Sequence, residues 1–333
     1  MMTFFHRLLL MLDAEVAHTL VITLLKGYQW LLFNILRRRM PSLNKGCSLP
    51  VFSKLNFRNR LGLAAGFDKG AEVFAALAQL GFGFIEVGTV TPKPQIGNPK
   101  PRLWRHPPDA LINHMGFNNC GLPRFKKNIE KYRRFVPGVP LFANIGKNFN
   151  TSLTEAIKDY QALLQSLRPY VDAFVINLSS PNTPGLQSLQ STTFLDQIAA
   201  VAPTDLPILI KLSPDLDNKT LLELYAQVNA TKKFNGVVVV NTSARLAQSL
   251  YQAPQGGLSG RPLFERALEC VALARGVLKY PKIIVGVGGV SSAEDVLKMR
   301  KAGADLVEIY TALIYRGPQI LRELSSVLER LPS

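Results

Sequence analysis

The sequence contains few of the residues that build metal sites and disulfides. Its 333 residues include four histidines and three cysteines, Cys47, Cys120 and Cys270. The cysteines are widely spaced, form no CxxC pair and leave one unpaired in any disulfide scheme, which favours a reducing cytosolic setting. No HExxH motif and no paired Cys/His spacing occurs, so we expect neither a catalytic nor a structural metal.

The N-terminal region also lacks an uninterrupted apolar run long enough to span a membrane. The run over 4–12 is too short, and the run over 20–35 is interrupted by Lys26, Gln29 and Asn34. No small-residue cleavage site follows that would mark a removed signal peptide. The region is therefore expected neither to cross a bilayer nor to be cut off.

An interfacial pair of helices fits residues 1–45 better. Apolar residues recur at helical spacing, at Leu20, Leu24, Leu31 and Ile35. Two aromatic residues, Tyr28 and Trp30, suit the headgroup boundary of a bilayer. The basic run Arg37, Arg38 and Arg39 could contact anionic lipid. The alternative is a helical hairpin that packs on the protein's own core.

Acidic residues are scarce relative to basic ones. The chain has 39 Lys and Arg against 23 Asp and Glu, a formal charge of +16, which indicates an anionic partner: a lipid surface, a nucleic acid or phosphorylated small molecules. The basic residues between 126 and 134 also fit the solvated face of a helix. Because no aromatic residues interleave with the basic clusters as they do where bases stack, we expect no nucleic-acid partner.

Residues 46–333 show eight short apolar runs separated by helical stretches. The runs cover 61–65, 84–87, 141–145, 173–177, 208–211, 236–240, 283–286 and 306–309. Such runs are typical of buried parallel strands, and 71–80, 153–167 and 292–302 have helical periodicity. Eight strand–helix units predict an α/β fold, a (β/α)₈ TIM barrel with a small N-terminal helical extension. The alternative is a doubly wound sheet, but no GxGxxG follows the first run.

In a barrel of this kind, function concentrates at the carboxyl ends of the strands, and almost every predicted strand ends in polar residues or glycine. The loop over 177–186 follows the fourth strand. Its prolines and glycine restrict the backbone, so its carboxamides and hydroxyls would be held ready to bind a small polar planar molecule. Local hydrogen bonds within an ordinary turn are the competing explanation.

Two further features at the strand ends carry chemistry. The glycines over 286–289, followed by a helix, place bare backbone amides where barrels commonly bind phosphate, which implies a phosphate-bearing cofactor. Lys69 and Lys211 end two strands, where buried lysines need partners; they could stabilise a reduced flavin or form a Schiff base. Asparagine outnumbers Asp and Glu in these loops, which indicates hydrogen bonding to imide or amide groups.

These motifs together resemble the class 2, quinone-linked and membrane-associated dihydroorotate dehydrogenases over nearly the whole chain. The matching segments are 12–18, 64–69, 86–92, 113–119, 144–148, 177–186, 211–215, 256–262 and 286–289. The resemblance implies oxidation of dihydroorotate to orotate in pyrimidine (UMP) biosynthesis, with FMN accepting hydride and passing electrons to a membrane quinone.

The resemblance also implies roles for individual residues. Those expected around FMN are Ala65, Gly66, Lys69, Thr89, Asn144, Asn177, Lys211, Gly260, Gly289, Tyr310 and Thr311. Those expected against dihydroorotate or orotate are Lys69, Asn113, His114, Met115, Gly116, Phe117, Asn177, Asn182, Asn241 and Thr242. Ser180 matches the catalytic base and Thr183 its relay partner, since a serine must pass its proton onward.

His18 and Arg105 resemble quinone-tunnel residues, and Tyr310 is expected where that tunnel meets the flavin. Two positions depart from the family pattern: His114 replaces a longer basic residue, and Val240 replaces a threonine that often faces the cofactor. We expect a monomer, peripheral on the cytoplasmic face of a bacterial cell membrane and bound to anionic lipid. Two other functions stay open, a flavin barrel acting on pyrimidines in tRNA and a non-enzymatic membrane-adsorbed module.

Overall fold

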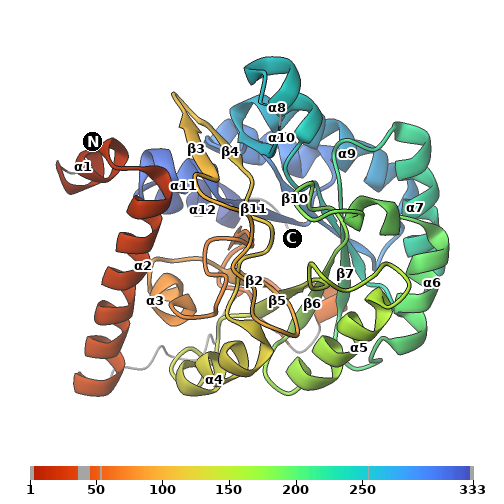
Figure 1. Cartoon of the computed structure of the whole chain (residues 1–333), viewed down its shortest axis with the longest axis horizontal. Helices are drawn as coiled ribbons and strands as arrows, with labels where there is room; N and C mark the ends of the chain where they lie inside the picture. The colour runs from red at the N-terminus through yellow and green to blue at the C-terminus, as the bar shows by residue number, and fades with distance from the viewer. Residues whose placement is uncertain (1–3, 37–45, 53–54, 254, 331–333) are drawn as a thin grey trace.

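The computed structural model describes residues 4–36, 46–52, 55–253 and 255–330. Its centre is a closed barrel of eight parallel strands in the order β1-β11-β10-β8-β7-β6-β5-β2 (Figure 1). The strands are β1 (Leu61–Leu63), β2 (Phe84–Val90), β5 (Leu141–Ile145), β6 (Ala173–Asn177), β7 (Ile208–Leu212), β8 (Gly236–Val239), β10 (Ile283–Val287) and β11 (Leu306–Ile309). All eight predicted strands and the predicted TIM barrel are confirmed.

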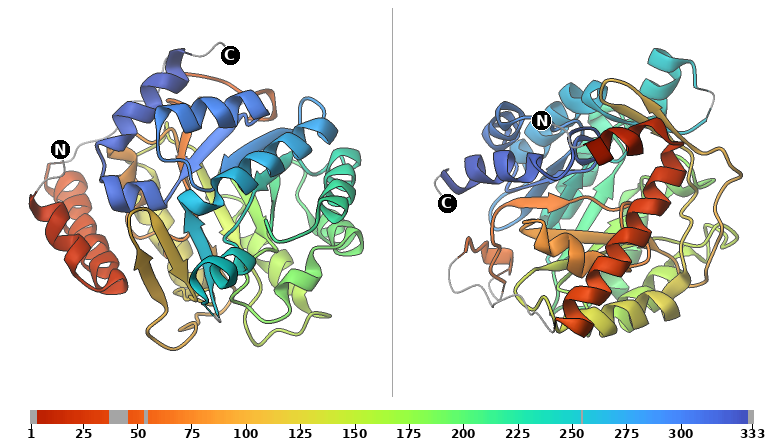
Figure 2. Two further views of the ribbon diagram at one scale, coloured as in Figure 1. Left: turned by 90° about the horizontal axis from the view of Figure 1, so that it is seen from above. Right: turned by 90° about the vertical axis from the view of Figure 1, so that its left-hand side faces the viewer.

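Helices surround the barrel and bury the outer faces of its strands (Figure 2). They are α3 (Phe74–Gln79), α4 (Gly121–Arg133), α5 (Ala156–Leu167), α6 (Thr192–Val201), α7 (Asn218–Ala230), α8 (Ala244–Tyr251), α9 (Phe264–Val277), α10 (Ala293–Ala302), α11 (Thr311–Arg316) and α12 (Ile320–Arg330). Short helical turns span Pro50–Phe52, Leu186–Leu189 and Arg261–Leu263. Strands such as β5 and β7 are buried along their whole length, which explains their continuous apolar sequence.

The inside of the barrel is apolar at the amino ends of the strands. Phe52 and Phe57 close this end and pack on Phe84 and Phe142, with ring centroids 5.0 to 5.9 Å apart for the Phe84–Phe142 and Phe57–Phe84 pairs. A Cβ atom at Gly62 would lie 2.2 Å from the Phe84 ring, so only glycine fits there. The polar residues of the barrel interior are therefore confined to the opposite, carboxyl end.

A second, antiparallel sheet of three strands was not expected from the sequence. Its strands are β3 (Leu103–His106), β4 (Ala110–Asn113) and β9 (Gly257–Gly260), in the order β3-β4-β9. Leu111 pairs with Ser259, so the sheet joins the loop after β2 to the segment before α9. Strands of only four residues are too short to show a clear periodic pattern, and the partner of β4 in β9 lies more than a hundred residues further along the chain.

The N-terminal extension contains α1 (Phe4–Met11), α2 (Ala14–Trp30) and a π-helical turn (Leu31–Ile35). Helix α2 runs along the outside of the barrel (Figures 1 and 2). Gln29 fixes it there, because the buried side chain donates to the Glu72 carbonyl at 2.9 Å and accepts from the Ala76 amide at 3.0 Å. Phe33 stacks on Phe135, beyond the end of α4, at 4.7 Å.

The same helices expose a broad apolar surface on their other side. Its members, which we call the apolar stripe, are 38% to 55% exposed: Val16, Leu20, Leu24, Tyr28, Trp30, Leu31 and Ile35. The segment Ala14–Ile35 is the one helical stretch among the described residues with the length and composition to cross a membrane. The expected basic run Arg37, Arg38 and Arg39 lies outside the described residues.

Candidate active site

A cavity opens at the carboxyl ends of the barrel strands. Ten of the eleven residues expected around the cofactor line it: Ala65, Gly66, Lys69, Thr89, Asn177, Lys211, Gly260, Gly289, Tyr310 and Thr311. The eleventh, Asn144, is fully buried beneath them. Val240, one of the two positions that depart from the family pattern, also lines the cavity.

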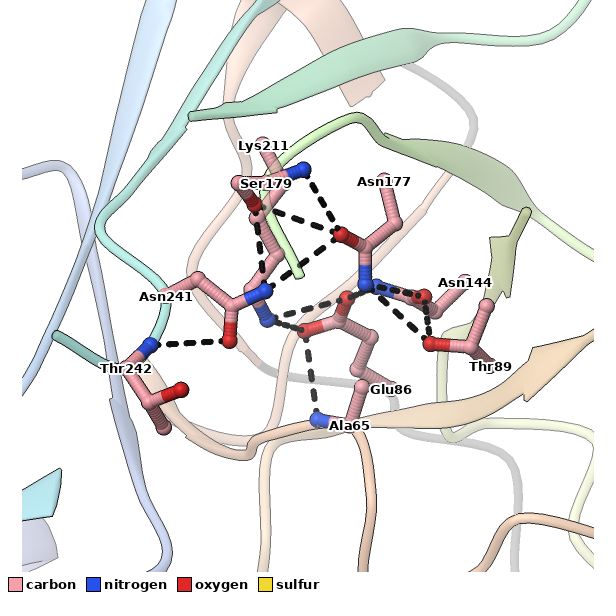
Figure 3. Close-up of polar contacts among 9 residues, drawn as sticks. All are labelled: Ala65, Glu86, Thr89, Asn144, Asn177, Ser179, Lys211, Asn241 and Thr242. Atoms are coloured by element: carbon pink, nitrogen blue, oxygen red, sulfur yellow. Dashed lines mark hydrogen bonds and ion pairs between the residues drawn. The ribbon is translucent and has the colours of Figure 1, made fainter. Parts of the chain in front are cut away.

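A network of amides and hydroxyls forms one side of this cavity (Figure 3). Asn177, at the end of β6, donates from Nδ2 to Thr89 Oγ1 and to Asn144 Oδ1, both at 3.1 Å. Asn241, after β8, donates to Ser179 Oγ at 3.1 Å. Because each amide is held by two or more partners, the groups that face the cavity are fixed before any ligand binds.

An ion pair lies inside the barrel below this network. Lys211 Nζ on β7 lies 3.2 Å from Glu86 Oε2 on β2, and the two side chains are 6% and 0% exposed. Glu86 also accepts hydrogen bonds from the Asn144 amide and from the Ala65 N–H. Lys211 was expected near the cofactor, but its partner Glu86 was missed, although an acidic residue inside an otherwise apolar strand is an available signal.

A second buried carboxyl group was also missed. Glu308 on β11 is 1% exposed and lines the floor of the cavity, and its carboxyl group lies against the carboxyl group of Glu86. Burial, followed by repulsion from Glu86, raises the pKa of Glu308 well above its ordinary value. The barrel interior thus contains one lysine and two glutamates at this level.

The loop after β6 places the expected substrate residues around one mouth of the cavity. Asn182 donates from Nδ2 to Asn113 Oδ1 at 2.9 Å, and Ser180 Oγ accepts from the Asn182 N–H at 3.3 Å. The expected residues that line the cavity are Lys69, Asn113, Met115, Gly116, Phe117, Asn177, Ser180, Asn182, Asn241 and Thr242. The loop therefore reaches the cavity with both its amide and its hydroxyl groups.

Two expected residues of this group lie behind the surface. His114 is not among the lining residues; its Nδ1 lies 3.2 Å from Asn182 Oδ1, so it contacts the loop that carries Ser180. Thr183 is 3% exposed, and its hydroxyl has no hydrogen-bond partner among the described residues. A buried hydroxyl without a partner is unusual, and it leaves the Thr183 oxygen free to accept or donate a proton.

The other end of the cavity is built from glycines and hydroxyls. Gly260, Gly288 and Gly289 line it with left-handed backbone, and the Ser259 and Thr311 hydroxyls lie 3.0 Å apart beside them. Arg261, also in the lining, forms an ion pair with Asp295 at 2.6 Å. Hydroxyls, glycine amides and a guanidinium form a donor set that suits a phosphate group.

Lys69 connects this cavity with a second one between α2 and the loop over 95–102, because it lines both. Burial, followed by repulsion from Arg102, lowers the pKa of Lys69 to about 8. Arg102 is itself paired with Glu15 of α2 at 2.8 Å. At neutral pH Lys69 therefore places a positive charge at the end of the cavity that is lined by Asn113 and Asn182.

The residues expected along a quinone path contact the N-terminal helices. His18 of α2 lines the second cavity, and its Nε2 lies 2.8 Å from the Phe67 carbonyl oxygen. The Phe67 ring meets His18 edge-on at 5.4 Å and Tyr310 at 5.9 Å, so an aromatic series runs from α2 to the first cavity. Arg105 on β3 donates to the Leu9 carbonyl of α1 at 3.1 Å.

His18 is held in its neutral form. Burial, followed by the Lys69 charge, lowers the pKa of His18 to about 4. Its imidazole therefore carries no charge at neutral pH and presents a flat, uncharged ring beside Phe67.

Comparison with known proteins agrees with this architecture. A family model described as dihydroorotate dehydrogenase matches residues 50–331. The dihydroorotate dehydrogenase (quinone) of Thermus thermophilus is 44% identical and covers 98% of this chain and 95% of its own; that of Marinomonas sp. is 42% identical and covers 95% and 93%. A crystal structure of DHODH from Eimeria tenella in complex with ferulenol aligns with a TM-score of 0.82 at 33% identity, over 95% of this chain and 90% of that one.

The full-length match includes the N-terminal helices as well as the barrel. Relatives with this coverage are named as quinone-dependent enzymes, which agrees with the resemblance found in the motifs. The chain belongs to the dihydroorotate dehydrogenase family, in its quinone-dependent class 2.

Proposed function

We propose that this protein oxidises dihydroorotate to orotate in pyrimidine biosynthesis, with FMN as its cofactor and a membrane quinone as the final acceptor. Membership of the quinone-dependent family supports the reaction, and family members are flavoenzymes. The observation that carries the proposal for this chain is the convergence of Asn177, Lys211 and Ser180 on one cavity that also has a glycine-lined end.

The cavity suits FMN at both ends. Backbone amides of Gly288 and Gly289, with the Thr311 hydroxyl and Arg261, would hold the phosphate. Thr89, Asn177 and Lys211 would hold the polar edge of the ring system, while Ala64, Val240 and Ile309 offer apolar walls for its faces. When bound, the flavin supplies the chemistry of hydride acceptance.

The proposed substrate lies against the loop after β6. Asn113, Asn182 and Asn241 offer donors and acceptors that match the imide edge of a pyrimidine, and Lys69 offers a positive charge for its carboxylate. The Ser180 hydroxyl takes the proton from C5 as hydride leaves C6. Because a serine is a weak base, it passes its own proton onward, and the unpartnered Thr183 hydroxyl is the proposed recipient.

Anaerobic mixing with dihydroorotate tests this proposal directly. The bound flavin is expected to bleach and then to recover its colour when quinone is added. Ser180→Ala should keep the flavin bound but slow the bleaching by at least about 10²-fold, the usual contribution of a positioned base. Ser188→Ala, at an exposed position in the helical turn that follows this loop, is the control and should bleach at the wild-type rate. Undiminished bleaching in Ser180→Ala would overturn the assignment.

We further propose that residues 1–45 are a membrane-associated quinone-access segment and 46–333 the FMN-binding catalytic domain. The apolar stripe would lie in the bilayer surface, and quinone would approach the cavity past His18, Arg105 and Tyr310. The exposure of the stripe, its tryptophan and tyrosine, and the Phe67 contacts support this path.

Basic residues beside the stripe support an anionic lipid partner. Lys127, Lys131 and Arg134 are exposed on or just after α4, next to the point where Phe33 anchors the π-helical turn. Positive charge at the edge of an apolar surface favours negatively charged headgroups. We propose a monomer without a nucleic-acid partner, peripheral on the cytoplasmic face of a bacterial cell membrane; the bacterial origin of the full-length relatives supports that location.

A further inference from the structure

Two side chains outside the cavity lining hold Asn182, in the loop that carries Ser180. His114 Nδ1 lies 3.2 Å from Asn182 Oδ1, and Asn98 Nδ2 donates to the Asn182 backbone carbonyl at 3.3 Å. Both residues come from the segments that follow β2, and neither lines the active-site cavity, whereas Asn182 does. The loop is therefore fastened from behind, on the side away from the ligand.

The hydrogen bonds through the Asn182 amide run in one direction. A backbone carbonyl can only accept, so the amide presents its Nδ2 to the Asn113 carbonyl at 3.0 Å, and the same Nδ2 donates to Asn113 Oδ1 at 2.9 Å. Asn113 in turn donates from its own Nδ2 to the Gly257 carbonyl at 3.3 Å. The Asn182 oxygen is left facing the His114 ring, so the Nδ1 of that ring must carry a hydrogen and donate it.

Asn98 forms a second tie between the same two segments. Its Nδ2 donates to the His114 carbonyl at 3.1 Å as well as to the Asn182 carbonyl. Its own place is fixed, because its backbone N–H donates to the Met115 carbonyl at 3.1 Å and a Cβ atom at Gly116 would lie only 2.9 Å from its amide. One amide group thus joins the Ser180 loop to the segment after β4.

The Asn182 backbone also contacts the proposed base. Its N–H donates to Ser180 Oγ at 3.3 Å, and both residues are nearly buried, at 5% and 6% exposed. A shift of Asn182 therefore moves an amide that faces the substrate and a hydrogen bond to the hydroxyl that takes the proton. Small displacements of such groups cost much of the rate, because reaction requires close alignment.

We propose that Asn98 and His114 are positioning residues that hold the Ser180 loop against the substrate, and that the His114 donor fixes which way the Asn182 and Asn113 amides face. The inference rests on the proposed function, since it takes the ligand of these amides to be the pyrimidine. The departure of His114 from the longer basic residue of the family pattern keeps the same direction, because lysine and arginine are also donors only.

Two substitutions of similar shape test the His114 donor. Asparagine carries an N–H group in the place of Nδ1, whereas leucine carries a methyl group there. Loss of one hydrogen bond should raise the orotate dissociation constant of His114→Leu about fivefold, and His114→Asn should bind orotate about fivefold more tightly than His114→Leu. Perturbation of the flavin spectrum reports the binding.

The FMN dissociation constant separates this role from a general loss of structure. It should be the same in His114→Leu and His114→Asn, because the phosphate end and the ring contacts are built from other residues. Equal orotate affinities in the two variants would overturn the role of the donor. An FMN dissociation constant that rises as much as that of orotate would show that His114 supports the fold and not the ligand.

Asn98→Asp tests the second tie. It keeps the shape of the side chain but turns a carboxylate toward the two carbonyl oxygens, so we expect orotate to bind at least about tenfold less tightly. Asn98→Ala, which only removes the donor, should lose about fivefold and serves if Asn98→Asp does not fold. Orotate affinity that is unchanged in Asn98→Ala would contradict the proposal.

Nitrogen NMR of histidine-labelled protein tests the direction of the hydrogen bonds without any reaction. The chain has four histidines, and the signal that disappears in His114→Asn belongs to His114. In alkaline solution we expect a proton on its Nδ1, and a bare Nδ1 would overturn the proposal. A wild type that binds no orotate would overturn the proposed function, whereas the protonated nitrogen would still decide how the Asn182 amide is held.

Discussion

Lys211 and Glu86 form an ion pair of 3.2 Å inside the barrel, where their side chains are 6% and 0% exposed. Two charges at this depth are stable only as a pair, because no water reaches either of them to solvate it if its partner is removed. The pair also fixes the lysine at the cavity floor, so the site depends on a residue that never touches a ligand.

Removing one partner of this pair should be strongly destabilising. We expect Lys211→Met to lower the free energy of unfolding by about 3–5 kcal/mol, since it leaves Glu86 buried and unpaired. Denaturant unfolding of the cofactor-free protein measures the effect. Lys298→Met is the control: its partner Glu294 lies 2.8 Å away on the exposed surface of α10, and we expect no measurable change. A Lys211→Met variant as stable as the wild type would contradict the prediction.

Binding of an anionic pyrimidine should weaken in alkaline solution. With its pKa lowered to about 8, Lys69 is cationic below that pH and loses its charge above it. If only the cationic form binds, the dissociation constant of orotate rises about tenfold for each pH unit above the pKa. Perturbation of the flavin spectrum by orotate reports the binding. Lys69→Arg stays charged and should give a flat profile over this range, and a flat wild-type profile would show that Lys69 does not contact the ligand.

The apolar stripe should control attachment to lipid vesicles. We expect the triple variant Leu24→Ser, Leu31→Ser and Ile35→Ser to bind vesicles containing phosphatidylglycerol more than about tenfold less tightly, because three exposed apolar side chains are lost. Co-sedimentation with vesicles measures the binding. Leu222→Ser, on α7 and 37% exposed, removes a comparable side chain elsewhere and should bind normally. Equal loss in both proteins would exclude a specific docking surface.

The cofactor-free protein should reveal Glu308 through the pH dependence of its stability. Folding raises the pKa of Glu308 above its ordinary value of 4.5. Above pH 4.5 the unfolded chain therefore loses this proton while the folded protein keeps it, and the free energy of unfolding of the wild type falls as the pH rises. Relative to Glu308→Gln, the loss should be about 1.4 kcal/mol for each pH unit until the folded-state pKa is reached. Below pH 4 the dependence should vanish. A stability difference that stays constant with pH would argue against a raised pKa.

The sequence was sufficient to predict the barrel and most of the residues around the cavity. Buried strands such as β5 leave continuous apolar runs, and parallel strands in a barrel bring their carboxyl ends to one face, so Asn177 and Lys211 could be placed together from order alone.

Other features depend on contacts that no local pattern records. Glu86 and Glu308 lie within apolar strands. The pairing of Glu86 with Lys211, and the repulsion between the two glutamates, arise only when β2, β7 and β11 come together in the barrel. The three-stranded sheet joins segments that are far apart in the chain. The position of His114 behind Asn182 depends on side-chain direction, which spacing alone does not give.

Phe67 belongs to two parts of the molecule at once. Its carbonyl group and ring hold His18 of α2, and the same ring packs against Tyr310 at the edge of the cavity. A displacement of α2 that moves His18 would therefore reach Tyr310 through this one ring. The seating of the N-terminal helix and the shape of the cavity edge thus depend on one shared aromatic side chain.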